Sequence, residues 1–128
     1  NYSIRILINY LEKIKLINKK INLDYVQIIC TNICDSDFED YTIFCKKKQL
    51  HNAIKSILIL LKRGFSVMDI LDSYFIYIKF SPVLNQKEKY EIIRLLCKYI
   101  TIFHNIHEDE IELSLFTNNV INILNNNI

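Results

Sequence analysis

The sequence predicts an all-α protein, a helical bundle of about seven helices. Gly and Pro occur only once each in the 128 residues, whereas β folds and βα loops use these residues for turns with special backbone angles. Hydrophobic residues make up 51% of the chain, which is enough for a core and argues against disorder. Apolar side chains recur at helical spacing along most of the chain.

The N-terminal part of the chain is expected to hold two helices. The first runs from about residue 3 to residue 18, with Ser3 as its N-cap. Its apolar face comprises Ile4, Leu7, Ile8, Leu11 and Ile14. A second, short helix is expected at about residues 23–33, and a polar, acidic break follows at residues 35–37. Composition and helix capping both change at this break, so the predicted domains are residues 1–34 and 35–128.

Five more helices are expected in the second domain. They lie at about residues 37–46 and 48–63, from Ser66 to before Pro82, and at about residues 86–104 and 108–124. Gly64 ends one of them because the residue after a helix often takes left-handed backbone, which Gly tolerates. Ser66 and Asp69 form a variant of the capping box, and Asn85 caps the next helix.

The apolar faces of the last four helices define the predicted core. In chain order they comprise Leu50, Ala53, Ile54, Ile57, Leu58 and Leu61; Val67, Ile70, Leu71, Tyr74 and Ile78; Ile92, Leu96, Tyr99, Ile100 and Phe103; Leu113, Phe116, Val120 and Leu124. Ile111 and Leu115 form a second apolar face on the last helix. Two apolar faces indicate a helix that is covered from both sides, here by a partner subunit.

Charge and hydropathy narrow the class of protein. The net charge is +2, with 16 basic and 14 acidic residues, which is not the strongly basic balance of a nucleic-acid-binding domain. The basic cluster at residues 46–48, 55, 62 and 63 fits a solvated helix face better than a phosphate site. No apolar run reaches the roughly 18 residues of a membrane span, and no signal peptide is expected.

Little in the sequence predicts catalysis or metal binding, and no catalytic or metal-ligating residue is predicted. The acidic groups at residues 35/37, 39/40 and 108–110 are expected at helix starts, where carboxylates stabilise free N–H groups. The four cysteines, at positions 30, 34, 45 and 97, are expected to be reduced core residues of a cytosolic or nuclear protein. A zinc site at Cys30, Cys34, His104 and His107 is the less favoured alternative.

Aromatic residues are dense in the second half of the chain. They include Tyr74, Phe75, Tyr77, Phe80, Tyr90, Tyr99 and Phe103. Their spacing follows the helix period, so we expect them to pack in the core and not to form a base-stacking platform.

Two segments resemble a known family. In the first, residues 1–12, Arg5, Asn9, Leu11 and Glu12 match the sensor 2 helix in the lid of AAA+ clamp-loader ATPases, although Tyr2 and Ser3 replace its usual Gly-Asp. Residues 21–26 resemble the start of the last lid helix.

The second segment, residues 60–71, resembles the Gly-aromatic-Ser-x-x-Asp-Ile turn in the collar of the replication factor C small subunit. A polar turn near residues 86–88, a helix with Ile92 and Ile93, and a last helix at 112–115 follow in the order of that collar. The family's Gly near the start of the last helix is absent, with His107 about where we expect it.

The resemblance implies a collar-type oligomerisation domain preceded by part of an AAA+ lid, in a larger protein. Such a collar joins four others in a hetero-pentamer, which loads the sliding clamp onto primer–template DNA during replication. Arg5 would be the nucleotide-binding sensor 2 residue near the ATP γ-phosphate. Upstream residues of the parent protein would bind most of the ATP and Mg and would contact the clamp and DNA. This chain alone would hold no cofactor and hydrolyse nothing, at a nuclear or other intracellular replication site.

Two other classes remain open. One is a free-standing helical adaptor or regulatory protein that binds partners through apolar helix faces. The other is an enzyme whose Cys and His pairs form a metal site. For Arg5, the alternative is a surface charge at a helix start, where the helix dipole disfavours it slightly.

Overall fold

The computed structural model describes residues 4–17, 22, 33–103 and 109–125. These residues form helices and no strand, so the predicted all-α class is confirmed. The helices are α1 (Ile4–Ile17), α3 (Asp35–Lys46), α4 (Leu50–Lys62), α5 (Val67–Phe80), α6 (Gln86–Phe103) and α7 (Glu110–Asn125). The helix expected at about residues 23–33 and the Ser3 cap fall outside the described residues, apart from Ile33, which is not helical.

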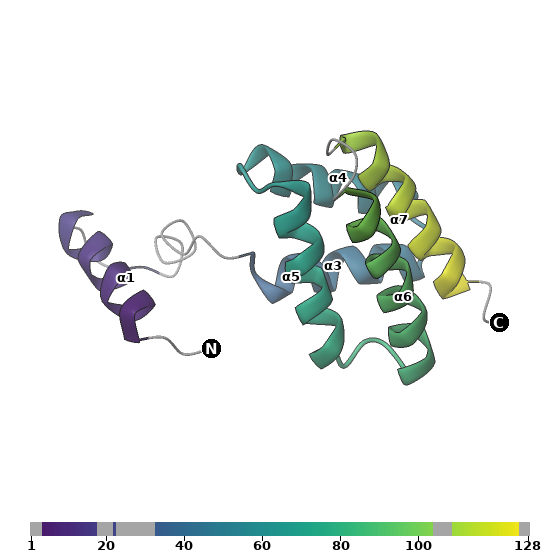
Figure 1. Ribbon diagram of the computed structural model, residues 1–128, viewed down its shortest axis with the longest axis horizontal. Helices are drawn as coiled ribbons and strands as arrows, with labels where there is room; N and C mark the ends of the chain where they lie inside the picture. Colours follow the sequence, from purple (N-terminus) through teal and green to yellow (C-terminus); the bar gives the residue numbers. More distant parts are fainter. Residues whose placement is uncertain (1–3, 18–21, 23–32, 104–108, 126–128) are drawn as a thin grey trace. The chain divides into compact units, whose positions relative to one another are not determined.

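The chain divides into two compact units, residues 1–32 (unit 1) and 33–128 (unit 2). In unit 1 the described helix is α1. In unit 2, α5, α6 and α7 run roughly side by side, and α3 and α4 cross behind them (Figure 1). Helix α3 packs against α4, α5 and α7, while α7 also packs against α4 and α6. The assignment of the two parts to a lid and a collar stays a prediction.

An aromatic cluster forms the centre of the unit 2 core. Tyr74 of α5 is fully buried, and its ring centroid lies 5.3 Å from both Phe38 and Tyr41 of α3. Phe116 of α7 meets Tyr74 edge-on at 6.3 Å and Tyr99 of α6 at 5.3 Å. Such tilted and edge-to-face pairs add to the stabilisation from burial alone. Four helices therefore meet at one group of rings.

The core carries hydroxyl groups that are all satisfied. The Thr42 hydroxyl donates to the Phe38 carbonyl at 2.7 Å, so the Tyr74 hydroxyl, 3.2 Å away, donates to Thr42. The Tyr41 hydroxyl donates to Thr117 Oγ1 at 3.2 Å, and Thr117 donates to a carbonyl of its own helix. Within the described ranges no buried side-chain N or O atom lacks a partner. The polar atoms therefore add directional links between helices, and their hydrogen bonds offset the cost of removing them from water.

The predicted apolar faces are confirmed for α5 and α7, with one correction on α4. All five predicted residues of α5 and all four of the main α7 face are buried. On α4, however, the buried residues are Ala53, Ile57 and Leu60, while Leu50 is 38% exposed. Ala53 and Ile57 belong to the predicted face, but Leu60 does not. Residues 57–61 are uniformly apolar, so spacing alone could not tell how far the buried face extends around the helix.

Two more expectations about burial are wrong. Phe80 and Tyr90 were expected in the core, but they are 82% and 67% exposed. Each lies off the buried face of its helix, which carries Tyr74 and Ile78 on α5 and Ile92 and Leu96 on α6. The other aromatics named for the core are buried or, for Phe75, half-buried.

Two helix starts are capped as the sequence predicts. Asp69 N–H donates to Ser66 Oγ at 3.0 Å, and Ser66 N–H donates back to Asp69 Oδ2 at 3.2 Å. At α6, Glu88 N–H donates to Asn85 Oδ1 and Asn85 N–H to Glu88 Oε2, both at 2.8 Å. The second pair is also a capping box, although only its Asn was predicted.

Helices α3 and α4 end in the same motif, which corrects one predicted boundary. After α4, Phe65 N–H bonds to the Leu60 carbonyl and Gly64 takes φ +96°. After α3, Gln49 N–H bonds to the Phe44 carbonyl, but here Lys48 holds the left-handed position at φ 58°. This is the Schellman arrangement. Because Lys48 completes it, α4 begins at Leu50 and not at Lys48 as expected.

Candidate interaction surfaces

Arg5, the predicted nucleotide-sensing residue, is exposed in the first turn of α1. That turn holds no acidic residue, and neither salt bridge within the described ranges involves Arg5. The helix dipole disfavours a cation at this end, so Arg5 does not stabilise its own helix through its charge. A guanidinium presents a fork of donors that suits phosphate oxygens. The arrangement is compatible with an external anion, and the sensor role stays a prediction.

Helix α1 presents its apolar face to the outside. The segment is helical as expected. The exposed fractions of the side chains on its predicted apolar face are 75% for Ile4, 59% for Leu7, 48% for Ile8 and 55% for Leu11. Ile14 and Tyr10 are half-buried. Among the α1 side chains that are described, none is fully buried.

The acidic groups mostly act as helix-start charges. Asp35 and Asp37 lie in the first turn of α3, as predicted, and Asp37 also accepts from Arg63 at 2.9 Å in an exposed salt bridge. Asp109 Oδ1 accepts from Ile111 N–H at 3.1 Å beside the start of α7. Glu39 and Asp40 differ from the prediction, since α3 begins at Asp35 and they fall in its second turn.

The cysteines separate into three environments. Cys45 is buried, Cys34 is half-buried, and both are free thiols. Cys97 is also free but exposed, so its predicted place in the core is wrong. It lies on α6 next to the buried Leu96, and one residue rotates a side chain by about 100° around a helix. Cys30 lies outside the described residues.

The zinc alternative receives no test, because Cys34 is the one candidate ligand that the structure describes. Across residues 4–17, 22, 33–103 and 109–125, no three His, Cys, Asp or Glu side chains gather as metal ligands. No helix in these ranges is long and apolar enough to cross a membrane.

Three buried titratable groups have strongly raised pKa values. Burial raises the pKa of the Cys45 thiol to about 12, against an ordinary value of 9.0. Burial also raises the pKa of the Tyr41 and Tyr74 hydroxyls well above their ordinary range. Charged forms are disfavoured where water is excluded. These groups therefore stay neutral at physiological pH, and Cys45 is a core residue and not an activated nucleophile.

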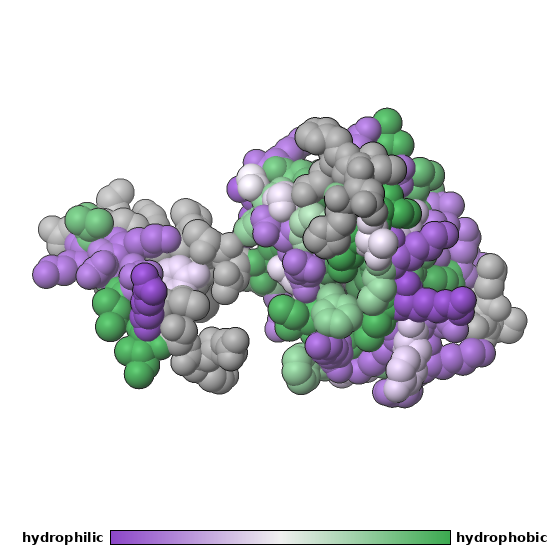
Figure 2. Space-filling model, viewed as in Figure 1, coloured by the Kyte–Doolittle hydropathy of each residue, from purple (hydrophilic) through white to green (hydrophobic). Residues whose placement is uncertain are grey.

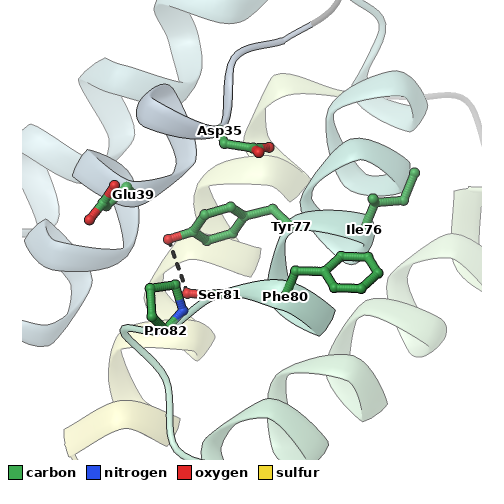
Figure 3. A pocket seen from close by; sticks show the side chains of 7 residues that line it. All are labelled: Asp35, Glu39, Ile76, Tyr77, Phe80, Ser81 and Pro82. Carbon is green, nitrogen blue, oxygen red and sulfur yellow. Dashed lines mark hydrogen bonds between the residues drawn. The ribbon is translucent and has the colours of Figure 1, made fainter. Parts of the chain in front are cut away.

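A groove opens on unit 2 between the start of α3 and the end of α5 (Figure 3). Its volume is about 170 Å³, and its lining comprises Asp35, Glu39, Ile76, Tyr77, Phe80, Ser81 and Pro82. Tyr77 forms the floor, and its hydroxyl accepts from Ser81 Oγ at 3.1 Å. On the α5 side Ile76 and Phe80 are 58% and 82% exposed, while Asp35 and Glu39 are exposed on the α3 side. We name this site the acidic groove.

The exposed side of α4 has the opposite charge. From position 41 to 68 the chain has six basic residues and no acidic one. Lys46 and Arg63 are used in salt bridges with Glu88 and Asp37. Lys55, Ile59 and Lys62 lie at i, i+4 and i+7 on one exposed stripe, with Ile59 48% exposed. We name these three residues the α4 basic face.

A further apolar patch lies on α7. Ile111 and Leu115, the predicted second face, are 66% and 49% exposed. They lie one turn apart on the side away from Leu113 and Phe116, which are buried. The space-filling view shows apolar side chains at several points on the unit 2 surface, between polar ones (Figure 2).

Comparison of the chain with protein-family models, with curated proteins and with solved structures finds no significant match.

The second face of α7 is predicted from the sequence, but the acidic groove is not. A signal for the groove was present, because Asp72, Ile76 and Phe80 recur every fourth residue on α5, off its buried face. Their closeness to Asp35 and Glu39 depends on how α5 packs on α3, which spacing within one helix does not encode.

Proposed function

We propose that this chain is the C-terminal part of a DNA clamp-loader small subunit, with unit 2 as its collar-type oligomerisation domain. The main support for this proposal is that unit 2 buries its own core and still exposes large apolar side chains. Ile76 and Phe80 on α5, and Ile111 and Leu115 on α7, lie outside that core. Exposed apolar clusters of this kind mark surfaces that a partner covers. The family is proposed because residues 1–12 and 60–71 resemble segments of clamp-loader small subunits.

In the proposed assembly the ATPase chemistry belongs to the parent protein. Upstream residues would bind ATP and Mg²⁺, and the collar would join the subunits in a hetero-pentamer that loads the sliding clamp onto primer–template DNA. Arg5 would report the nucleotide state to the lid, since its guanidinium suits phosphate. A free-standing adaptor is the second candidate, because unit 2 buries its own core and needs no neighbour for that.

The proposal is tested by purifying the intact parent protein with its partners and measuring the mass, stoichiometry and DNA-stimulated ATPase activity of the complex. We expect a hetero-pentamer that hydrolyses ATP. A lone monomer or homodimer without ATPase partners would refute the clamp-loader proposal and support the adaptor.

Arg5 is tested in the same preparation. Arg5→Ala should lower ATP hydrolysis on the order of 100- to 1,000-fold, the range for loss of one hydrogen-bond donor to charge that develops in the transition state. The mass of the complex should not change. Lys15→Ala, at an exposed position in the last turn of the same helix, is the matched control and should keep full activity. Equal activity of both variants would assign Arg5 to the surface.

A further inference from the structure

The acidic groove has the size of a side-chain site. Its volume of about 170 Å³ is below the roughly 300 Å³ at which small-molecule sites begin. Its apolar wall, Ile76 and Phe80, is open to the outside (Figure 3). One branched apolar side chain from another molecule would bury this wall and remove apolar surface from water.

The rim of the groove selects the charge of its occupant. Asp35 and Glu39 lie one turn apart on α3, so their carboxylates line the same edge. Neither takes part in the two salt bridges found within the described ranges, which join Lys46 to Glu88 and Arg63 to Asp37. Asp72, exposed one turn before Ile76 on α5, lies outside the lining of the groove but on the same face of the helix as Ile76. An apolar side chain flanked by Lys or Arg is therefore the complementary ligand.

The same chain displays that ligand on α4. Ile59 is an exposed branched side chain, and Lys55 and Lys62 flank it along the stripe. The two lysines are about 10 Å apart along the helix axis, at 1.5 Å per residue. Their long side chains can converge on carboxylates that are closer together.

We propose that the acidic groove of one chain binds the α4 basic face of a second copy. Because the two surfaces differ, the contact is heterologous and joins copies head to tail, as a ring if the rotation closes and as an open chain if it does not. Ile59 enters the groove beside Phe80, and Lys55 and Lys62 reach Asp35 and Glu39. The proposal rests on residues of unit 2 alone and does not depend on the proposed function.

The test is sedimentation of the full 128-residue chain over a wide range of concentrations, at low and at high salt. We expect the average mass to rise with concentration, and the association to weaken with salt because exposed charges are screened. Asp35→Lys with Glu39→Lys, and separately Lys55→Glu with Lys62→Glu, should each weaken self-association by about tenfold or more, since like charges then face each other.

The decisive sample combines all four substitutions in one chain. Both surfaces then change sign, so self-association should return to the level of the unaltered chain. An equimolar mixture of the two double variants should also associate. Glu91→Lys with Glu110→Lys, on α6 and α7 outside both surfaces, is the control that matches the change in net charge of the Asp35 and Glu39 double variant, and it should associate normally. Circular dichroism confirms that each variant is helical.

Three results would overturn the proposal. The unaltered chain could remain a monomer at every concentration and salt. Association could persist in both double variants, as expected if the exposed apolar face of α1 were responsible. Finally, the fourfold variant could fold and stay monomeric. None of these results bears on a hetero-pentamer formed by the intact parent, so the two proposals fail independently.

Discussion

Helices α1 and α4 are close in length, at 14 and 13 residues, and both are amphipathic. Their surroundings differ. In α4, Ala53, Ile57 and Leu60 are buried against the rest of unit 2. In α1, Leu7 and Leu11 are more than half exposed. Apolar spacing thus predicts the helix in both cases, but it does not predict what covers the apolar face.

This difference in burial between α1 and α4 affects how much each helix contributes to stability. Most of the stability of a protein helix comes from packing its apolar face, and an isolated helix of this length is marginal in water. Unit 2 supplies that packing from its own residues, through one continuous core. Among the described side chains of α1, by contrast, none is fully buried. Substitutions should therefore act very differently in the two units.

The largest expected effect is loss of a ring from the centre of unit 2. Phe116→Ala removes a fully buried side chain that contacts Tyr74 and Tyr99 edge-on. It should lower the free energy of unfolding by about 3–5 kcal/mol, the usual range for an aromatic residue cut to Ala in a core. Denaturant unfolding followed by circular dichroism measures this.

The matched substitution on α1 is Leu11→Ala, at a side chain that is 55% exposed. It should change the free energy of unfolding by no more than about 0.5 kcal/mol. Similar losses for both variants would contradict the difference between the two units, because α1 would then contribute to a core as α7 does.

The next effect is a loss of stability at alkaline pH, which should come from unit 2. Cys45, Tyr41 and Tyr74 have higher pKa values in the folded chain than in the unfolded one. As pH rises the unfolded chain loses these protons first, so folding becomes less favourable. Stability should be constant up to about pH 9 and then fall by up to about 1.4 kcal/mol per pH unit for each group. For Cys45 the fall continues to its folded pKa, about 12.

Denaturant unfolding at a series of pH values measures the slope. Tyr74→Phe removes one of the three groups and should make the alkaline slope shallower. Tyr90→Phe changes a tyrosine that is 67% exposed, and it should leave the slope as it is. A stability that stays constant to pH 11 would contradict the assignment of these groups to a dry core.

The smallest expected effects compare the two helix ends within unit 2. Lys48→Gly removes the cost of left-handed backbone in an L-residue and should stabilise the chain by up to about 1 kcal/mol, partly offset by the added freedom of the unfolded chain. Gly64→Ala should destabilise it by about 1 kcal/mol. Apart from Gly64 and its two chain neighbours, no residue has a heavy atom within 4 Å of the added Cβ, so the cost comes from backbone conformation.

Thermal unfolding of both variants checks the sign of each effect. Lys47→Gly serves as the control, since Lys47 has φ −81° and gains nothing from Gly. A loss of stability in Lys48→Gly would mean that the Lys48 side chain makes a contact worth more than the strain.

Most of the fold could be predicted from the sequence because helix starts, helix ends and buried faces depend on residues within one helix. Scarce Gly and Pro indicate helices, and Ser66 with Asp69 marks a helix start through hydrogen bonds that span three residues. The buried faces of α5 and α7 follow from regular apolar spacing. On α4 the same spacing predicts the buried Ala53 and Ile57 but misses Leu60, because the apolar run at 57–61 offers several faces. The helix boundary at Lys48 is also missed, because its left-handed backbone has no sequence signal.

The candidate surfaces were harder to predict because they depend on tertiary packing. Ile111 and Leu115 are visible in the sequence because they share one helix. The acidic groove combines residues from α3 and α5 that are some 40 positions apart in the sequence. The family assignment and the role of Arg5 stay predictions, because neither apolar spacing nor the packing of the described helices tests them.

The position of α7 has a consequence for how the chain emerges from the ribosome. Its Thr117 accepts from Tyr41, and Asn125 Nδ2 donates to the Cys45 carbonyl at 3.2 Å, so the last helix closes contacts begun some 80 residues earlier. Until α7 is synthesised, the apolar faces of α3, α4 and α6 that it covers remain open to water. Unit 2 therefore completes its fold only after α7 leaves the exit tunnel, and until then its open apolar surface makes the nascent chain prone to aggregation.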